Sequence, residues 1–493
     1  MGSASPDLTD RAAVKGVETA SARRRAALAL REGELGFFLL LGDLCAAVIA
    51  SYGTPMLWAL FDRDFAPTAG LPAWQVTFPI LWALLLRLFG AGDIVTPRFA
   101  RRSMAGVAQA YVTATAFVLA IFFFVPFFIP RASSLGAVAI AALVTLMIRF
   151  VFLRVASVSV LERRVVVLGT DVAARRAAGV LTSSTTLRYR VVCFFDAGSG
   201  VQEEEVGIPV RPLPSDLWAA LSELQVDLVV VGHTRTLPER VLAELVRCFE
   251  GGIEAVPATM LYEQLSGRVL VSALEADWYA DLPTSQRSLY GAFKRAVDTT
   301  LAALSLIVVS PLLGAIALAV ALDSRGPILL HQRRVGQRRT TFTLHKFRSM
   351  RADAEAAGEA LWASPEDPRR TRVGRVLRRS RLDELPQLWN VVRGHMSLIG
   401  PRPERPEFVD RLAAELPLYS ARLLVRPGLT GWAQVMYPYA ASVEENLAKL
   451  EYDLYYIRHF GPLLDLSILL RTVSIVLGLS KPEFSEAPRR RAP

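Results

Sequence analysis

The stretch TTLAALSLIVVSPLLGAIALAVAL, Thr299–Leu322, decides the fold, because it contains no charged residue. Its length is sufficient for a helix that crosses the ~30 Å hydrocarbon core of a bilayer. Ser310 and Pro311 stand in its middle, and a proline there removes a helix hydrogen bond and clashes with the preceding turn. Two interpretations follow, a proline-kinked spanning helix or a helix that breaks and returns.

The charges beside this run favour the second interpretation. Lys294 and Arg295 precede it, and a series of arginines follows between residues 325 and 339. A spanning helix is usually basic on one side only. We therefore expect a re-entrant helix over residues 296–322, which dips into one leaflet and returns at Ser310–Pro311.

The composition of the whole chain agrees with a membrane protein of several domains. It has 493 residues, of which 52% are hydrophobic, and a formal net charge of +10. Excess positive charge in an apolar chain indicates anionic lipid heads or phosphorylated ligands as partners. We expect no nucleic-acid partner, because the basic residues lie at the ends of apolar runs rather than in one stripe.

Four apolar stretches precede the central run and predict a transmembrane bundle over residues 34–158. They are Gly36–Leu60, Val76–Leu88, Val107–Ile129 and Leu135–Leu153. Basic residues cluster before the first stretch, between the second and third, and after the fourth: Arg23, Arg24, Arg25, Arg31, Arg98, Arg101, Arg102, Arg154, Arg163 and Arg164. By the positive-inside rule, both ends of the bundle and the basic segment 1–33 are cytoplasmic.

Residues 163–275 alternate between strand and helix patterns, which predicts a soluble, doubly wound α/β domain with a parallel, Rossmann-like sheet. A dinucleotide site is the obvious hypothesis for such a domain. The first turn, LGTDVAA, has one glycine where the fingerprint needs three, and Asp171 would repel a pyrophosphate. A structural or regulatory module is the better interpretation.

Downstream of the apolar run, ILLHQRRV and TTFTLHKF resemble two strands joined by a turn around Gly336 and Gln337. Lys346 and Arg348 belong to the second strand region. Such cations can hold anionic lipid, or they can bind a phosphorylated substrate. The residues alone leave both possibilities open.

The stretch RRSRLDELPQLWNVV, Arg378–Val392, places two adjacent carboxylates behind arginines. Because proline is tolerated only in the first helical turn, Pro386 predicts a helix that begins at Asp383, with Asp383 as its N-cap and Glu384 in its first turn. Ordinary capping chemistry accounts for such a pair. The alternative is a site at which a divalent metal is bridged to phosphates, with Arg375 among the surrounding cations.

Six motifs in the last two hundred residues closely resemble the bacterial sugar transferase family, the monotopic phosphoglycosyl transferases. The resemblance covers about residues 290–478, and the catalytic domain that it implies is residues 290–479. The motifs are KRAVDTTLAALSLIVVSPLLG, GPILLHQRRVGQ, FTLHKFRSM, LRRSRLDELPQLWNVVRGHMSLIGPRPERPEF, VRPGLTGWAQV and KLEYDLYYIRHFGPLLDLSILLRT. The resemblance implies a mixed α/β catalytic domain with a re-entrant helix. With the bundle and the α/β domain, the chain looks like the long form of the family, which initiates exopolysaccharide, capsule or O-antigen synthesis.

The resemblance also implies an activity. It is transfer of a hexose-1-phosphate, with glucose or galactose as the leading sugars, from a UDP-sugar to polyprenyl (undecaprenyl) phosphate, with release of UMP. Asp383 is then the nucleophile, and Glu384 holds Mg²⁺ or handles a proton, so that the dyad is also the implied metal site. The implied phosphate-binding residues are Lys346, Arg378 and Arg402, with Arg348 and Arg375 as weaker candidates.

The implied location is the bacterial inner membrane, with the catalytic domain on its cytoplasmic face. Lys294, Arg295 and Asp298 then lie where the lipid phosphate enters, and a homodimer is possible. One departure from the family is Arg381, which stands two residues before the aspartate where the family often has a small polar residue. The tail 480–493 is basic and predicted to be disordered.

Two rival functions remain. A membrane-bound NAD-dependent nucleotide-sugar dehydratase or epimerase needs an intact glycine-rich loop and a Tyr-x-x-x-Lys pair. The pair here, Tyr290 and Lys294 in YGAFK, lies outside the α/β region. A non-catalytic scaffold for polysaccharide assembly is the second rival, and the intact Asp-Glu dyad argues against it.

Overall fold

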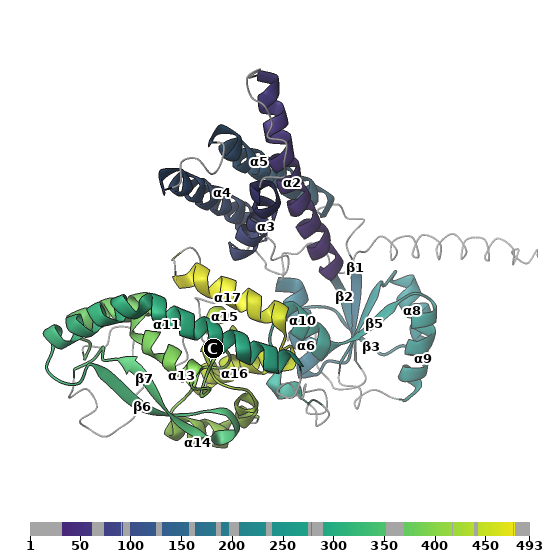
Figure 1. The fold of residues 1–493 in the computed structure, drawn as a ribbon. Helices are drawn as coiled ribbons and strands as arrows, with labels where there is room; N and C mark the ends of the chain where they lie inside the picture. Colours follow the sequence, from purple (N-terminus) through teal and green to yellow (C-terminus); the bar gives the residue numbers. More distant parts are fainter. Residues whose placement is uncertain are drawn as a thin grey trace, which may run out of the picture. The chain divides into compact units, whose positions relative to one another are not determined.

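The computed structural model describes residues 32–61, 73–89, 91, 99–124, 131–156, 163–183, 189–196, 207–232, 239–274, 278, 289–351, 369–416, 418–437, 442–476 and 478. Most of the basic N-terminal segment and the whole predicted tail, 480–493, lie outside these residues. The chain divides into two compact units, residues 1–266 and 267–493. Each unit is described by itself (Figure 1).

The first unit begins with the helical bundle, which confirms the four predicted helices. These are α2 (Glu32–Phe61), α3 (Ala73–Leu88), α4 (Phe99–Phe124) and α5 (Arg131–Ala156). By length and composition, Phe37–Leu57 and Ser134–Phe152 can cross a membrane, and Gln75–Arg87 and Gly106–Leu119 are shorter apolar helices. The third predicted stretch continues to Ile129, but residues 125–130 lie outside the described part of the chain.

A buried ion pair explains how a charged residue is accommodated in this bundle. The Arg149 guanidinium on α5 contacts the Asp43 carboxylate on α2 at 2.6 Å, and both side chains are almost fully buried. A lone charge at this depth is costly, so intramembrane charges pair with one another. Arg149 lies within the fourth apolar stretch, Leu135–Leu153, and the sequence does not show which residue is its partner.

The remainder of the first unit is a five-stranded parallel sheet of order β3-β2-β1-β4-β5, which confirms the predicted parallel sheet. Its strands are β1 (Arg163–Leu168), β2 (Tyr189–Asp196), β3 (Val210–Pro212), β4 (Leu228–Val231) and β5 (Glu254–Pro257). Helices α6 (Val172–Ser183) and α10 (Ala258–Ser266) pack together on one face, and α8 (Leu217–Glu223) and α9 (Glu239–Glu250) on the other (Figure 1).

Asp171 occupies the turn between β1 and α6. Its carboxylate accepts hydrogen bonds from the backbone N–H groups of Ala173 and Ala174 at 2.9 and 3.1 Å. In dinucleotide-binding proteins the pyrophosphate sits at this helix N-terminus. The Asp171 carboxylate therefore occupies the position that a pyrophosphate would take at the N-terminus of α6. This supports a structural or regulatory role for the domain rather than dinucleotide binding.

The second unit contains the apolar run and the carboxylate dyad. Its helices are α11 (Leu289–Asp323), α12 (Arg372–Ser380), α13 (Leu388–Val392), α14 (Pro406–Glu415), α15 (Trp432–Met436), α16 (Val443–Arg458) and α17 (Pro462–Val476). The strands are β6 (Leu329–Val335), β7 (Thr341–Phe347), β8 (Ser397–Ile399) and β9 (Gly428–Thr430), and 3-10 turns include η3 (Val271–Ala273), η5 (Gln337–Arg339), η6 (Leu382–Gln387) and η7 (Tyr419–Leu424). β6 and β7 form the predicted antiparallel hairpin.

The long apolar helix, α11, runs without interruption through Ser310 and Pro311 (Figure 1). The predicted break in the helix is therefore not present. Pro311 has no N–H to donate to the Ile307 carbonyl, four residues back. The Ser310 hydroxyl donates to that same carbonyl at 2.7 Å, so the serine satisfies the acceptor that the proline leaves free.

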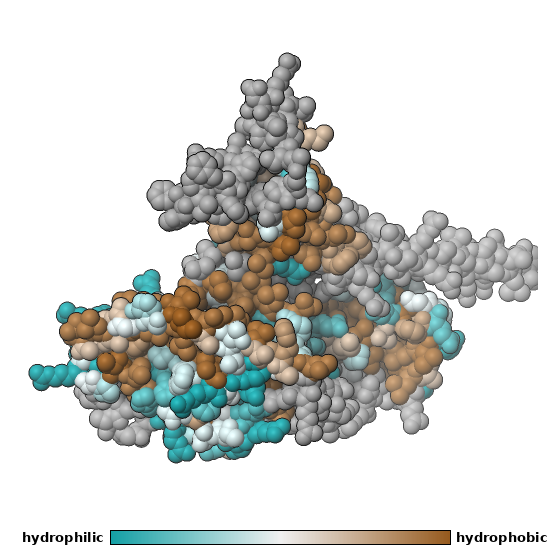
Figure 2. Space-filling view, viewed as in Figure 1, coloured by the Kyte–Doolittle hydropathy of each residue, from teal (hydrophilic) through white to brown (hydrophobic). Residues whose placement is uncertain are grey.

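One side of α11 is covered by its own unit along most of its length. Ala302, in the N-terminal half, packs in a cluster with Leu388 and Val391. Ile316 and Val320, in the C-terminal half, pack in a second cluster with Phe347 and Leu377. The opposite side exposes large apolar residues, among them Ile307, Val308, Leu318 and Leu322, and Figure 2 shows hydrophobic side chains gathered over this helix.

Candidate active site

The carboxylate dyad lies in η6, between α12 and α13, and not at the start of an α-helix as predicted. Arg381 ends α12 in the left-handed conformation, with φ of 60° and ψ of 13°. The chain then turns into the 3-10 helix Leu382–Gln387, which contains Asp383, Glu384 and Pro386. The N-cap prediction for Asp383 is wrong, because Arg381 makes the junction. Pro386 is accommodated by the 3-10 turn rather than by the first turn of a longer helix.

Helix α12 is fixed against the end of the hairpin by two local features. Its N-cap is Thr371, whose hydroxyl accepts from the Gly374 N–H at 2.9 Å. A side chain at Gly374 would collide with the Ser349 backbone, so glycine is required for this close approach. One helical turn later, Arg378 Nε donates to Ser349 Oγ at 2.8 Å. This brings the Arg378 guanidinium beside the dyad.

Asp383 is buried, with 7% of its surface exposed. Its carboxylate accepts no hydrogen bond from any residue that the structure describes. Burial raises the pKa of Asp383, and the neighbouring Glu384 raises it further, whereas Arg378, Lys346 and Arg402 act to lower it. The structure thus holds a carboxylate whose oxygens are uncommitted and whose charge is balanced at a distance by three cations.

Glu384 has a different environment. Its Oε1 accepts from the Arg402 guanidinium at 2.7 Å. Burial acts to raise the pKa of Glu384, but the attraction and hydrogen bond of Arg402, with Arg381 and Lys346, outweigh it, so the pKa is lowered. The two adjacent acids are therefore electrostatically distinct. The pKa of Asp383 is raised and its oxygens accept no hydrogen bond from the described residues, whereas the pKa of Glu384 is lowered and its carboxylate is paired with Arg402. Such divergence is typical of carboxylates with separate tasks.

Lys346 reaches the dyad from β7, which packs against η6. Burial lowers the pKa of Lys346 to about 8, helped by Arg334, Arg378 and Arg402, whereas Asp383 acts to raise it. Its ammonium makes no hydrogen bond or ion pair with the described residues. A cation crowded by other cations, with no anion bound to it, indicates a place for an anionic ligand.

Three of the five predicted phosphate-binding residues meet at the dyad: Lys346, Arg378 and Arg402. Arg348 does not. Its buried guanidinium donates to the backbone oxygens of Val320 and Ser324, at 3.3 Å and through a shorter 2.5 Å contact, and so holds the C-terminal end of α11. Arg375 is exposed on α12, and its side chain makes no polar contact within the described part of the chain.

The predicted lipid-phosphate residues lie at the N-terminal end of α11 and are engaged with the protein. Lys294 forms an ion pair with Asp465 at 2.9 Å and lies 3.7 Å from Asp298. Arg295 donates to the Val391 and Val392 carbonyls at 2.7 and 3.0 Å. Both line a cavity that also includes Arg426.

The same contacts bear on the dehydratase hypothesis. The Tyr290 hydroxyl donates to Asp465 at 2.6 Å, and Lys294 binds the same carboxylate. The Tyr-x-x-x-Lys pair therefore joins α11 to α17, in a different unit from the parallel sheet.

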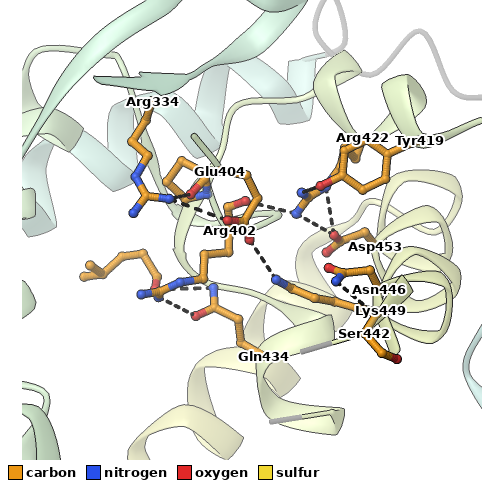
Figure 3. Close-up of polar contacts among 12 residues, drawn as sticks. Arg334, Arg402, Glu404, Tyr419, Arg422, Gln434, Ser442, Asn446, Lys449 and Asp453 are labelled. Atoms are coloured by element: carbon orange, nitrogen blue, oxygen red, sulfur yellow. Dashed lines mark hydrogen bonds and ion pairs between the residues drawn. The ribbon is translucent and has the colours of Figure 1, made fainter. Parts of the chain in front are cut away.

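Several site residues were missed by the sequence analysis. Gln434 Oε1 accepts from Arg402 at 3.3 Å, and Glu404 is bound by Arg334 and Lys449 at 3.5 and 2.9 Å. Figure 3 shows these side chains pointing toward one another from the hairpin, the GPRP loop (Gly400–Pro403), α15 and α16. The GPRP motif was the available signal, since its two prolines have no N–H and leave the loop dependent on donors from elsewhere.

The fold and site together define a membrane-associated protein with a carboxylate dyad surrounded by cationic side chains. A profile of the bacterial sugar transferase family matches residues 289–478. A UDP-glucose:undecaprenyl-phosphate glucose-1-phosphate transferase of Xanthomonas campestris pv. campestris is 32% identical over 358 residues, which cover 70% of this chain and 72% of the relative. The chain belongs to the bacterial sugar transferase family.

Two other relatives match shorter lengths of the chain. A UDP-N-acetylgalactosamine-undecaprenyl-phosphate N-acetylgalactosaminephosphotransferase of Aeromonas hydrophila is 42% identical over 233 residues, 47% of this chain and 54% of the relative. An undecaprenyl-phosphate glucose phosphotransferase of Komagataeibacter xylinus is 44% identical over 185 residues, 36% of this chain and 35% of the relative. The chain thus spans about half or less of the length of these two relatives.

Proposed function

We propose that the protein transfers a sugar-1-phosphate from a UDP-sugar to undecaprenyl phosphate, with release of UMP, and so initiates synthesis of an exopolysaccharide, capsule or O-antigen. The observation that carries the proposal is Asp383, a buried and uncommitted carboxylate among Lys346, Arg378 and Arg402. The printed names of relatives include glucose and N-acetylgalactosamine transferases, which adds N-acetylgalactosamine to glucose and galactose as candidate sugars.

In the proposed first step, a carboxylate oxygen of Asp383 attacks the β-phosphorus of the UDP-sugar. The bond between that phosphorus and the bridging oxygen breaks, and UMP leaves with the electron pair. An aspartyl phospho-sugar remains. In the second step a phosphate oxygen of the lipid attacks the same phosphorus, and the Asp383 carboxylate is expelled. Each step exchanges one phosphorus–oxygen bond for another.

The surrounding cations make this attack possible. A carboxylate is a weak nucleophile, and a diphosphate repels it unless charge is neutralised. Lys346 and Arg378 supply positive charge beside Asp383, and Arg402 fixes Glu384 at 2.7 Å. Catalysis of phosphoryl transfer rests largely on such positioning and electrostatics.

Mg²⁺ is part of the proposal, and the residues fit it. Magnesium is usually held by one or two carboxylates together with substrate phosphates. The dyad offers two adjacent carboxylates, and the oxygens of Asp383 accept no hydrogen bond from the described residues. No cluster of three or more acidic, histidine or cysteine ligands occurs among those residues, so the substrate would complete the coordination. Bound there, the ion would neutralise phosphate charge.

Removal of divalent metal is expected to stop turnover. EDTA should abolish UMP release from UDP-sugar by the protein in native membranes, and excess Mg²⁺ should restore it. The matched control is the same concentration of EDTA saturated beforehand with Mg²⁺, which should leave the rate of UMP release unchanged. Full activity in EDTA would contradict the metal part of the proposal while leaving the role of Asp383 standing.

We further propose that α11 lies within one leaflet of the membrane, with its apolar face toward the lipid, and does not cross the bilayer. Support comes from its packing, since the same unit covers one face of both its N-terminal and its C-terminal half, while the other face is apolar. A helix so covered cannot cross a bilayer without carrying its unit into the hydrocarbon. The unit then lies on the cytoplasmic face of the inner membrane, where UDP-sugars occur, and the cavity lined by Lys294, Arg295 and Arg426 is the proposed lipid-phosphate entrance.

A panel of UDP-sugars tests the function directly. The protein in membranes, supplied with undecaprenyl phosphate and Mg²⁺, is expected to release UMP with one or a few of UDP-glucose, UDP-galactose and UDP-N-acetylgalactosamine. Release of UDP instead of UMP would contradict the proposal, because it would place the bond cleavage at the sugar. No turnover of any donor would favour the scaffold.

The pKa of Lys346 predicts a basic limb in the activity profile. Lys346 must be charged to hold phosphate, so kcat/KM for the UDP-sugar should fall as pH rises through about 8. Lys346→Arg should move this limb to higher pH. Stability should change in the opposite direction, because the unfolded lysine keeps its proton to about pH 10.5 and stability rises where the unfolded state binds more protons. A limb unchanged in Lys346→Arg would contradict the assignment.

A further inference from the structure

The GPRP loop that carries Arg402 is held through four consecutive carbonyl groups. The Pro401 carbonyl accepts from Gly428 N–H at 2.8 Å, and the Glu404 carbonyl accepts from Val335 N–H at 2.9 Å. Between them, the Arg402 carbonyl accepts from Arg422 at 3.0 Å and the Pro403 carbonyl from Arg334 at 3.1 Å. Two of these residues are prolines and have no N–H, so the loop depends on donors from elsewhere in the unit.

Arg422 is the donor that acts on Arg402 itself. It is buried, with 4% of its surface exposed, and comes from η7. Its Nε donates to Asp453 at 3.1 Å and its Nη1 to the Tyr419 hydroxyl at 2.7 Å. Its Nη2 donates to the Arg402 carbonyl at 3.0 Å and also lies close to Asp453. Figure 3 shows it between Tyr419 and Asp453. The planar fork uses all three nitrogens at once, which a lysine cannot do.

The electrostatics of Arg422 agree with a permanent anchor. Asp453 lies 2.8 Å from Arg422 Nη2 and is itself almost fully buried, on α16. Arg422 also acts to lower the pKa of Glu404, which burial alone would raise and which stands at about 2 with the help of Lys449 and Arg334. Burial raises the pKa of Asp453, and the adjacent Arg422 acts to lower it. The hydrogen bonds of Arg422 are all made within the protein, without a substrate to complete them.

We propose that Arg422, anchored by Asp453 and Tyr419, is a positioning residue for the reaction: it fixes the backbone of Arg402, and through Arg402 the carboxylate of Glu384. The chain of contacts runs from Asp453 to Arg422, to the Arg402 carbonyl, and from the Arg402 guanidinium to Glu384 at 2.7 Å. Arg422 itself makes no contact with the dyad. This inference rests on the proposed function of the dyad.

A double-mutant cycle between positions 422 and 402 tests the inference. Arg422→Lys keeps the charge but cannot span its three acceptors, and kcat/KM for UMP release is expected to fall about 10-fold, as small misplacements in an active site do. In the Arg402→Ala background, the same substitution should lower kcat/KM by less than about twofold, because the residue through which it acts is gone. Arg411→Lys, at an exposed ion pair on α14, is the matched control.

The outcomes separate the inference from the proposed function. UMP release by the wild-type protein reports on the proposed function alone. A 10-fold loss that persists in the Arg402→Ala background would overturn the positioning role, since a general structural defect adds to any other. Wild-type kcat/KM in Arg402→Ala or in Arg422→Lys would also overturn it.

A milder variant covers the case in which Arg422→Lys does not accumulate in membranes. Tyr419→Phe removes only the hydroxyl that accepts from Arg422, with the ring retained. It is expected to lower kcat/KM about threefold in the wild-type background and not at all in the Arg402→Ala background, following the same coupling. Equal losses in both backgrounds would overturn the inference.

Discussion

Asp383→Asn is expected to lower UMP release at least about 1,000-fold, as loss of a nucleophile does in other enzymes that use one. The amide has the size and shape of the carboxylate, so the fold of η6 should be retained. It cannot form the phospho-sugar ester, however. Glu384 cannot take over, because its Oε1 is bound by Arg402 at 2.7 Å. The measurement is UMP released per protein in membranes, at matched expression.

Two arms make this test specific. Asp410→Asn, which changes an exposed aspartate on α14, should leave the rate within about twofold of wild type. A UDP-sugar labelled in its β-phosphate, supplied without lipid acceptor, should label the wild-type protein and not Asp383→Asn. Full activity of Asp383→Asn would remove Asp383 as nucleophile. A fully active wild-type protein that acquires no label under rapid quench would favour direct transfer to the lipid.

Arg402→Ala is expected to lower kcat/KM about 100- to 1,000-fold, the range seen when one preorganised charge-stabilising donor is removed. The substitution leaves the half-buried Glu384 without its ion-pair partner. The pKa of Glu384 should rise, because Arg402 is the main influence that opposes the effect of burial. Loss of a hydrogen bond to a charged group should also lower the free energy of unfolding by about 1–3 kcal/mol.

The conservative variant distinguishes charge from geometry. Arg402→Lys restores one positive charge but not the fork that contacts both Glu384 and Gln434, so it should recover stability more than activity. Arg411→Ala, at an exposed pair, is the control and should change neither. If Arg402→Ala retains kcat/KM within about threefold of wild type, Arg402 has no part in the transition state and the proposed phosphate site is wrong at this position.

Secondary structure was predicted well where the pattern is local. The four-helix bundle follows from apolar length, the parallel sheet from alternating strand and helix segments, and the β6–β7 hairpin from two strand patterns around Gly336. The helix start at Asp383 was predicted wrongly for a local reason as well. Arg381 adopts φ of 60°, which a non-glycine residue rarely does. Nothing in the local pattern therefore indicates that α12 ends there and that a 3-10 turn follows.

The cations around the dyad show where local reasoning stops. Lys346 and Arg348 are two residues apart, so a continuing strand would place them on one face. β7 ends at Phe347, however, and Arg348 turns away to hold the end of α11. Arg375 and Arg378 both lie on α12, yet only Arg378 lies next to Asp383. The choice among candidate cations depends on where elements end, which packing decides.

The sequence by itself indicated a membrane protein of the sugar transferase family and singled out Asp383 and Glu384 as the proposed catalytic pair, because apolar length, charge asymmetry and contiguous motifs are properties of short segments. Only the tertiary structure decided how the two acids differ. Glu384 is paired because the GPRP loop, held by Arg422 and Arg334, delivers Arg402 to it. Asp383 is uncommitted because no described donor reaches it. These contacts join residues far apart in the chain, and spacing along a sequence contains no measure of such distances.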